Sequence, residues 1–135
     1  MARYTGPRLK KVRSLGSDLP GLTRKSAERR PYPPGQHGQG KKQMSDYKVR
    51  LMEKQKIRFN YGISEKALRK YFFEAKRRRK VTGNELLSIL ESRMDSVLFR
   101  AGFAPTISAA RQLIAHGHLK VNGKKMDIPS YFVRA

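Results

Sequence analysis

After residue 44, apolar residues recur at intervals of three and four, a spacing that places them on one face of an α-helix. The first stretch predicts a helix over 45–60, which Tyr61-Gly62 would end. The second predicts a helix that Ser64 caps and that runs out in the basic residues 76–80, which suit a helix C-terminus. The two apolar stripes are Tyr47, Leu51 and Phe59, and Leu68, Tyr71, Phe72 and Ala75.

A third apolar stripe predicts one continuous helix over 84–101. Thr82 and Glu85 fit a capping box, in which each side chain bonds to the backbone N–H of the other residue. Gly102 is a natural stop for this helix. The stripe consists of Leu86, Leu90, Met94, Val97 and Leu98.

A short helix and a hairpin are predicted after it. Ser108 can cap a helix over 108–116 that turns Leu113 and Ile114 inward and ends at Gly117.

Asn122-Gly123 then lies between two short runs, and a type I′ hairpin turn requires positive φ at both of its central positions. We therefore expect a β-hairpin over 119–126, with Ile128-Pro129 ending its second strand.

Residues 1–44 have a different pattern, because glycine and proline interrupt them too often for long regular elements. A short basic helical turn fits around Arg8–Leu15. The apolar residues Leu9, Val12, Leu15, Leu19 and Leu22 are scattered, so we expect the rest of this segment to order mainly against a partner.

The predicted fold class is α+β. It comprises an extended basic N-terminal arm over 1–44, a small helical domain over 45–83 and a helix-turn-helix-plus-hairpin module over 84–135.

The charge of the chain indicates its kind of partner. Lys and Arg number 31 against 10 Asp and Glu, a formal net charge of +21, and both halves of the chain are basic. Such an excess repels itself in a compact domain, so a polyanion that neutralises it is expected. Nucleic acid is the first candidate, and an anionic membrane surface is the second.

Composition excludes several classes of protein. The chain has no Cys, which excludes disulfides and thiolate metal sites. It has no apolar run near 18 residues, and its N-terminus lacks the apolar core of a signal peptide. The expected location is therefore the cytoplasm or an organelle matrix.

Candidate catalytic and metal-binding groups are few. Glu91 and Asp95 are four residues apart on one helix face, but the basic neighbour Arg93 favours structural ion pairs over acid–base chemistry. His116 and His118 flank Gly117, which is better explained as a helix stop, and a zinc site would lack further ligands. We expect no enzyme activity, no metal and no cofactor.

The glycine-rich residues 35–40 follow Pro33-Pro34 rather than a strand, so they do not fit a nucleotide-binding loop. They are interpreted as an RNA-clamping loop, with a flexible linker as the alternative.

Candidate RNA-binding residues carry basic, imidazole, amide, hydroxyl or aromatic groups, which contact phosphates, sugars and unstacked bases. In the N-terminal arm they are Arg3, Arg8, Lys10, Lys11, Arg13, Arg29, Arg30, Gln36, His37, Lys41 and Lys42. In the helical domain they are Tyr47, Arg50, Lys54, Lys56, Arg58, Arg69, Lys70, Arg77 and Arg78. In the last module they are Arg93, Thr106, Ser108, Arg111, Gln112, His116, His118, Lys120, Asn122, Lys124 and Lys125.

Several segments in order resemble the small-subunit ribosomal protein four family, of bacterial or organellar type. They are Glu28–Gly38, Ser45-Asp46-Tyr47, Glu53–Lys56, Tyr61–Glu65, Leu90–Asp95, Ser108–Ile114, His116–Gly123 and Ile128–Tyr131. The last four segments alone would be ambiguous, because the RNA-binding module named after this family also occurs in pseudouridine synthases and a tyrosyl-tRNA synthetase appendage.

The resemblance implies a structural component of the small ribosomal subunit that binds the five-prime domain of its RNA, nucleates assembly and contributes to decoding accuracy. It implies neighbouring ribosomal proteins as partners, with no membrane and no homo-oligomer. Many relatives hold four Cys that bind zinc near the N-terminus, so this chain resembles the zinc-free branch. The family continues beyond the position of Ala135, so we expect the chain to be C-terminally incomplete.

Three other functions remain as alternatives. An appendage of an RNA-modifying or aminoacylating enzyme requires catalytic sequence outside the module. A DNA regulator would use helices 84–101 and 108–116 as a helix-turn-helix, but this leaves the hairpin and the basic N-terminal half without a role. A membrane-surface peptide does not require such well-capped, aromatic stripes.

Overall fold

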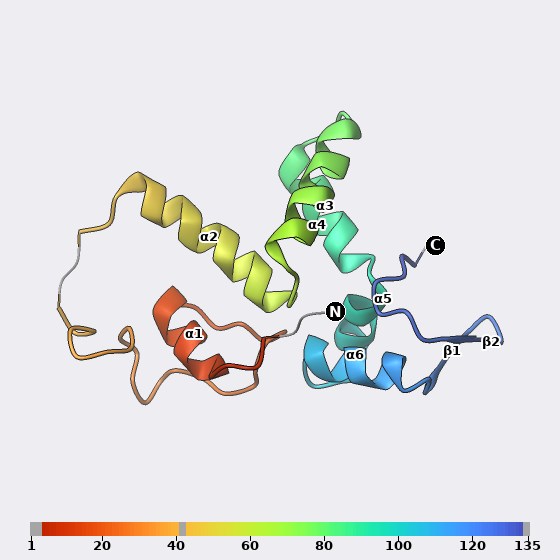
Figure 1. Cartoon of the computed structure of the whole chain (residues 1–135), viewed down its shortest axis with the longest axis horizontal. Coiled ribbons are helices and arrows are strands. Elements are labelled where there is room, and N and C mark those ends of the chain that lie inside the picture. Colours follow the sequence, from red (N-terminus) through yellow and green to blue (C-terminus); the bar gives the residue numbers. More distant parts are fainter. Residues whose placement is uncertain (1–3, 41–42, 134–135) are drawn as a thin grey trace.

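The computed structural model describes residues 4–40 and 43–133 (Figure 1). Its elements in chain order are α1 (Arg8–Leu15), α2 (Asp46–Asn60), α3 (Glu65–Arg77), α4 (Thr82–Glu91), α5 (Met94–Arg100), α6 (Ile107–Ala115), β1 (Leu119–Val121) and β2 (Lys124–Met126). α1 lies beside α2, and α3 lies beside α4 (Figure 1). α5, α6 and the hairpin lie together at the lower right of the view (Figure 1). The α+β class expected from the sequence is confirmed.

Local signals placed the ends of α2 and α3 correctly. The Ser45 hydroxyl accepts a hydrogen bond from the Lys48 backbone N–H, and the Ser64 hydroxyl accepts one from the Ala67 N–H. These side chains satisfy backbone donors that the first helical turn leaves free. Gly62 follows α2 with φ of 58°, a left-handed conformation that ends the helix.

The continuous helix expected over 84–101 is wrong. α4 ends at Glu91 and α5 begins at Met94, because Arg93 between them is extended, with φ −71° and ψ 141°. Arg93 forms an isolated antiparallel bridge with Phe132, and the Val133 N–H donates to the Ser92 carbonyl. Pairing with this distant segment therefore replaces helical hydrogen bonds at the break.

The capping box at Thr82 is also wrong. α4 begins at Thr82 itself after Val81, and no side chain caps it. The Glu85 carboxylate lies 3.3 Å from Nη1 of Arg78 and 3.8 Å from Nζ of Lys80, so it pairs with the end of α3 rather than with its own helix start.

The cap of α6 lies two residues earlier than expected. Thr106 rather than Ser108 accepts the capping hydrogen bond, from the Ala109 N–H at 3.2 Å. Ile114 is fully buried as predicted, whereas Leu113 is exposed, so the inward placement of Leu113 was wrong. Gly117 follows the helix with φ of 74°, which confirms the predicted stop.

The hairpin is confirmed with its turn. β1 and β2 pair in antiparallel register, and Asn122 and Gly123 have φ of 49° and 79°, the positive values that a type I′ turn requires. The second strand ends at Met126, before Ile128-Pro129.

Three apolar clusters stabilise the chain. One joins residues from α3, α4, α6 and the turn after α2: Tyr61, Ile63, Leu68, Leu90 and Ile107. A second lies between α5, α6 and the hairpin: Met94, Leu98, Ala104, Ala110 and Ile114. The third lies in the N-terminal segment: Val12, Leu15, Leu19 and Leu22.

The third cluster corrects the expectation that the apolar residues of the arm are scattered. Val12, Leu15, Leu19 and Leu22 are all buried, and Met52 and Phe59 of α2 pack against them. The arm thus covers α2, whose own stripe contributes no fully buried residue.

Two aromatic positions expected on inward stripes lie at the surface. Tyr47 is 75% exposed and Phe72 is 45% exposed. The helical period was correct for α2 and α3, but the apolar faces are covered only where a neighbouring element reaches them.

Candidate nucleic-acid interface

The hairpin presents lysines that form no ion pair with any carboxylate in the described part of the chain. Lys120 and Lys125 are direct partners in the antiparallel register, and both side chains are exposed. Like charges opposite each other destabilise a strand pair. Lys124 and Asn122 are exposed on the same short ribbon. The arrangement costs stability in the free protein and suits a bound polyanion.

Gly117 brings the hairpin close to the histidines at the end of α6. A Cβ at Gly117 would lie 2.7 Å from Nζ of Lys125, so the lysine side chain passes directly over this glycine. The rings of His116 and His118, on either side of Gly117, are 6.1 Å apart between centroids and are exposed. The lysines and imidazoles that the sequence predicted as separate candidates therefore lie together here.

The N-terminal basic residues divide into two groups. Arg8 donates to the Leu22 carbonyl, and Arg13 donates to the carbonyls of Arg30 and Tyr32, so these two side chains hold the arm in shape. The Lys11 ammonium lies 5.0 Å from the centroid of the Phe59 ring. Besides Arg8, the exposed candidates of the arm are Lys10, Arg29, Arg30, Gln36 and His37. Arg3, Lys41 and Lys42 lie outside the described residues.

The glycine-rich loop is compact where it is described. The Gly38 N–H donates to the Gly35 carbonyl, and the Gly40 N–H donates to the His37 carbonyl. A Cβ at Gly38 would collide with the Pro33 carbonyl. The loop therefore holds the exposed Gln36 and His37 side chains at a tight turn rather than along an extended strand.

Several candidate cations on α2, α3 and the turn after α3 already have anionic or polar partners. Lys54 pairs with Glu65, Lys56 with Glu53, Arg77 with Glu74, and Arg78 with Glu85, while Arg58 donates to Gln55. Exposed pairs of this kind are weak, so a phosphate can compete for the same cations. Tyr47, Arg50, Arg69 and Lys70 are exposed candidates on the same two helices.

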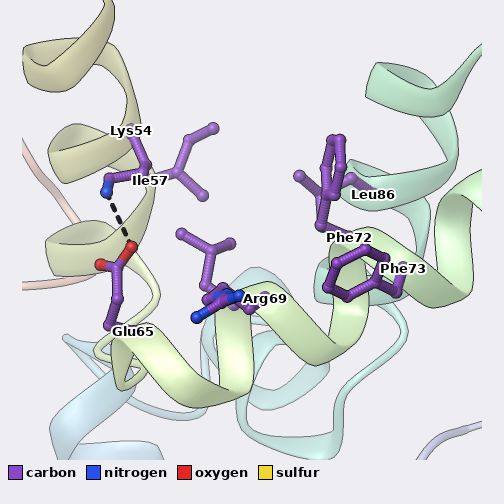
Figure 2. Close-up of a pocket in the computed structure, with 8 residues that line it drawn as sticks. Lys54, Ile57, Glu65, Arg69, Phe72, Phe73 and Leu86 are labelled. Atoms are coloured by element: carbon purple, nitrogen blue, oxygen red, sulfur yellow. Dashed lines mark hydrogen bonds and ion pairs between the residues drawn. The ribbon is translucent and has the colours of Figure 1, made fainter.

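An apolar hollow of about 560 Å³ lies between α2, α3 and α4 (Figure 2). Phe72, Phe73 and Leu86 line one end, and the Lys54–Glu65 ion pair spans the opposite rim (Figure 2). Its walls are mostly carbon, so this hollow is not a phosphate site.

Three candidates from the last module lie inside the protein. Arg93 is 2% exposed, and its guanidinium donates to both carboxylate oxygens of Asp95, at 3.0 and 2.8 Å, and to the Tyr71 hydroxyl. Thr106 is 8% exposed and is occupied as the cap of α6. Burial and saturated donors or acceptors do not fit the direct RNA contacts that the sequence suggested for Arg93 and Thr106.

Arg111 is the third of these. Its Nε donates to Asp95 Oδ2 at 2.7 Å, its Nη2 donates to the Tyr61 carbonyl at 2.7 Å, and its Nη1 donates to the Gly62 carbonyl. Burial alone would lower the pKa of the neighbouring Arg93, but the hydrogen bonds and charge of Asp95 outweigh it and raise that pKa. Both guanidinium groups are directed at the same carboxylate. Ser108 and Gln112 are the more accessible candidates on α6.

Glu91 forms a second polar cluster near the module boundary. Its carboxylate accepts two hydrogen bonds from Arg100, at 2.9 and 2.6 Å, and one from the Tyr61 hydroxyl. Hydrogen bonding from Arg100 lowers the pKa of Glu91, and burial followed by the Glu91 hydrogen bond raises the pKa of Tyr61 to about 12. The ion-pair role predicted for Glu91 and Asp95 fits both clusters, although their partners are Arg100, Arg93 and Arg111.

Phe103 is a surface residue that the sequence reasoning did not select. It is 72% exposed in the turn between α5 and α6. The available signal was an aromatic residue between Gly102 and Pro105, in a turn with no apolar periodicity. Exposed aromatic rings can stack with unpaired RNA bases.

Comparison with known families supplies the decisive observation. The model of the ribosomal protein S4/S9 N-terminal domain matches residues 3–91, and the model of the S4 domain matches residues 92–135. The chain belongs to the ribosomal protein S4 family. The resemblance found in the sequence is thereby confirmed.

Curated relatives in this family are similar over nearly the whole chain. The small ribosomal subunit protein uS4 of Methylobacillus flagellatus is 58% identical over 136 residues, covering 99% of this chain and 66% of the relative. The protein of the same name from Synechococcus elongatus is 60% identical over 134 residues, covering 99% of this chain and 65% of the relative. The chain thus spans slightly less than two thirds of the length of these S4 proteins.

Within residues 4–40 and 43–133, no cluster of three or more His, Cys, Asp or Glu side chains has the geometry to hold a metal ion. None of the described helices is long and apolar enough to cross a membrane.

Proposed function

We propose that this chain is a structural component of the small ribosomal subunit that binds its ribosomal RNA. The observation that carries the proposal is the pair Lys120 and Lys125, which face each other across the strands of the exposed hairpin. Within residues 4–40 and 43–133, neither lysine forms an ion pair. The names of the S4-family relatives place those proteins in the small ribosomal subunit, which supports RNA as the missing anion.

The proposed interface has three parts. The first is the hairpin with the adjacent histidines, and the second is the exposed basic side of α2 and α3. The third is the N-terminal arm with its glycine-rich loop. The exposed candidate contacts are Arg8, Lys10, Arg29, Arg30, Gln36, His37, Tyr47, Arg50, Lys54, Arg69, Lys70, Arg77, Arg78, Gln112, His116, His118, Lys120, Asn122, Lys124 and Lys125, and Ser108 is a half-buried candidate.

Phosphate contacts would position the protein, while RNA shape and unstacked bases would supply selectivity. The binding site proposed on the RNA is its five-prime domain, and early binding there would nucleate assembly and contribute to decoding accuracy. Neighbouring ribosomal proteins are the proposed protein partners, in the cytoplasm or an organelle matrix.

A salt titration of binding tests the breadth of this interface. If roughly eight phosphates are neutralised, the slope of log affinity against log salt for five-prime-domain RNA should be about −5 to −8. A slope shallower than about −2 would contradict a broad phosphate interface.

A DNA regulator is a weaker second reading. α5 and α6 adjoin through a turn, but Arg111, the strongest base-reading side chain of the short helix, is occupied by Asp95 and two backbone carbonyls. The surface of α6 retains Gln112 for base contacts, too little for a recognition helix.

A further inference from the structure

Arg111 connects two parts of the chain that the family models treat separately. It belongs to α6, in the region matched by the S4 domain, and two of its donors reach the carbonyls of Tyr61 and Gly62, about fifty residues earlier. Those carbonyls lie at the C-terminal end of α2, where unpaired backbone acceptors carry partial negative charge. The planar guanidinium group of Arg111 thus supplies hydrogen-bond donors to backbone carbonyls at the C-terminal end of α2.

Asp95 fixes the orientation of this fork. Asp95 has no exposed surface, and it accepts hydrogen bonds from Arg111, Arg93 and the Ser96 backbone N–H. The two arginines compensate one buried carboxylate, while Arg111 has two further acceptors in the α2 terminus. A lysine at position 111 could supply the charge but not three donors in one plane.

The N-terminal end of α6 is connected to the end of α2 by a second set of hydrogen bonds, through Gly21. The Ile107 N–H donates to the Gly21 carbonyl at 2.9 Å, and the Gly21 N–H donates to Oδ1 of Asn60 at 2.9 Å. Ile107 is also buried in the cluster that contains Tyr61 and Leu90. α6 is therefore attached to the end of α2 both at its first residue and one turn later.

We propose that Arg111 is a positioning residue, which locks α6 to the end of α2 and thereby fixes the hairpin lysines relative to the basic surface of α2 and α3. The sequence suggested a direct RNA contact for this arginine. Instead, its effect on RNA passes through the relative placement of two other surfaces. The structural part of this inference stands on protein contacts alone, and its consequence for binding rests on the proposed function.

Two surfaces held in one geometry bind one rigid RNA with an avidity that is lost when the linkage loosens. The hairpin and the α2–α3 surface would each still contact phosphate separately. A variant that frees α6 should therefore weaken binding to RNA that engages both surfaces at once, although it removes no phosphate contact.

Distance measurements in the RNA-free chain test the lock directly. The chain contains no Cys, so spin labels can be attached at Val49→Cys on α2 and Asp127→Cys after the hairpin, both exposed positions. Arg111→Lys keeps the charge but loses the fork. We expect the distance distribution between the labels to broaden in Arg111→Lys and to stay as in the parent in Gln112→Ala, the exposed neighbour on α6.

A second variant disturbs the same joint without changing any charge. A Cβ at Gly62 would lie 3.1 Å from Nη1 of Arg111, and Gly62 has φ of 58°, so Gly62→Ala presses on the guanidinium and strains the backbone. Gly102→Ala is the matched control, because Gly102 also has a positive φ, 81°, but a Cβ there would meet open space. Broadening in Gly62→Ala but not in Gly102→Ala supports the lock, even if Arg111→Lys fails to fold.

Unchanged distances in both Arg111→Lys and Gly62→Ala would overturn the inference, as would equal broadening in Gly102→Ala. Binding to five-prime-domain RNA provides the second readout. A positioning role predicts about a tenfold loss of affinity in Arg111→Lys, whereas a phosphate contact predicts little loss because the charge remains. If the parent chain itself does not bind RNA, the proposed function fails while the distances still decide the structural claim.

Discussion

Lys120 and Lys125 are direct cross-strand partners on an exposed two-stranded ribbon. The protein places two positive charges together where a neutral pair would be more stable, and this local cost is explained if the ribbon meets phosphate. Stability and binding should therefore respond to the same substitution in opposite directions.

The first prediction concerns this pair. Lys120→Thr should raise the free energy of unfolding by about 0.2–1 kcal/mol, because it removes the facing charge, and should make the salt slope of RNA binding shallower by about one. Urea unfolding and a salt titration measure the two effects. Lys124→Thr is the control, since Lys124 faces Val121, and it should change only binding. Lower stability in Lys120→Thr would contradict the account.

The second prediction concerns the buried carboxylate of Asp95. Asp95→Ala leaves the guanidinium of Arg93 buried without its anion, and removing one partner of such a pair typically costs about 3–5 kcal/mol. Urea unfolding monitored by circular dichroism should show this loss. Glu65→Ala is the comparison, because it breaks only the exposed pair with Lys54 and should cost about 1 kcal/mol or less. Equal effects of the two substitutions would show that Asp95 is not a structural centre.

The ends of the helices show which structural features a sequence can predict. The cap at Ser64 and the turn at Asn122-Gly123 were identified correctly, because a cap or tight turn depends on residues within three or four positions. The break at Arg93 was missed, because its cause is pairing with Phe132, a residue far along the chain. The N-terminal cluster around Val12 was missed for the same reason, since α2 supplies its other side.

The candidate site shows a similar division. Charge and residue type selected Lys120, Lys125 and His118, which lie at the surface together. The same criteria selected Arg93 and Arg111, whose guanidinium groups face Asp95 instead. Residue type alone does not distinguish an arginine that binds phosphate from one that neutralises a buried carboxylate. The two roles are distinguished only by the contacts in the folded structure.

The third prediction concerns pH. The pKa of Glu91 is lowered in the folded chain, chiefly by Arg100, so its contribution to stability is complete above the ordinary glutamate pKa of 4.5 and is lost as the pH falls through the lowered value. The pKa of Tyr61 is raised from 10 to about 12, so its contribution is complete below pH 10 and is lost between pH 10 and 12.

Urea unfolding across both pH ranges measures these losses. Glu91→Gln should remove the Glu91 contribution to the loss of stability at acidic pH. It should also reduce the loss of stability at alkaline pH, because Tyr61 would no longer face a carboxylate. An unchanged pH profile in Glu91→Gln would contradict the role assigned to this cluster.

The fourth prediction concerns Gly21, which lies between the ends of α2 and α6. A Cβ there would collide with the Asn60 carbonyl and approach the Ile107 side chain, so Gly21→Ala should lower the free energy of unfolding by about 1–3 kcal/mol. Gly83→Ala is the control, because a Cβ at Gly83 meets open space and alanine favours the helix in which it lies. Full stability of Gly21→Ala would show that the arm does not fix α6.

The central claim is recognition of folded ribosomal RNA through several surfaces held in one geometry. The most direct measurement is competition at one salt concentration among three ligands: folded five-prime-domain RNA, the same RNA with its junction disrupted, and duplex DNA. The account predicts a strong preference for the intact junction, because phosphate contacts alone would not distinguish the three. Equal affinity for all three would contradict it and leave the chain as a general polycation.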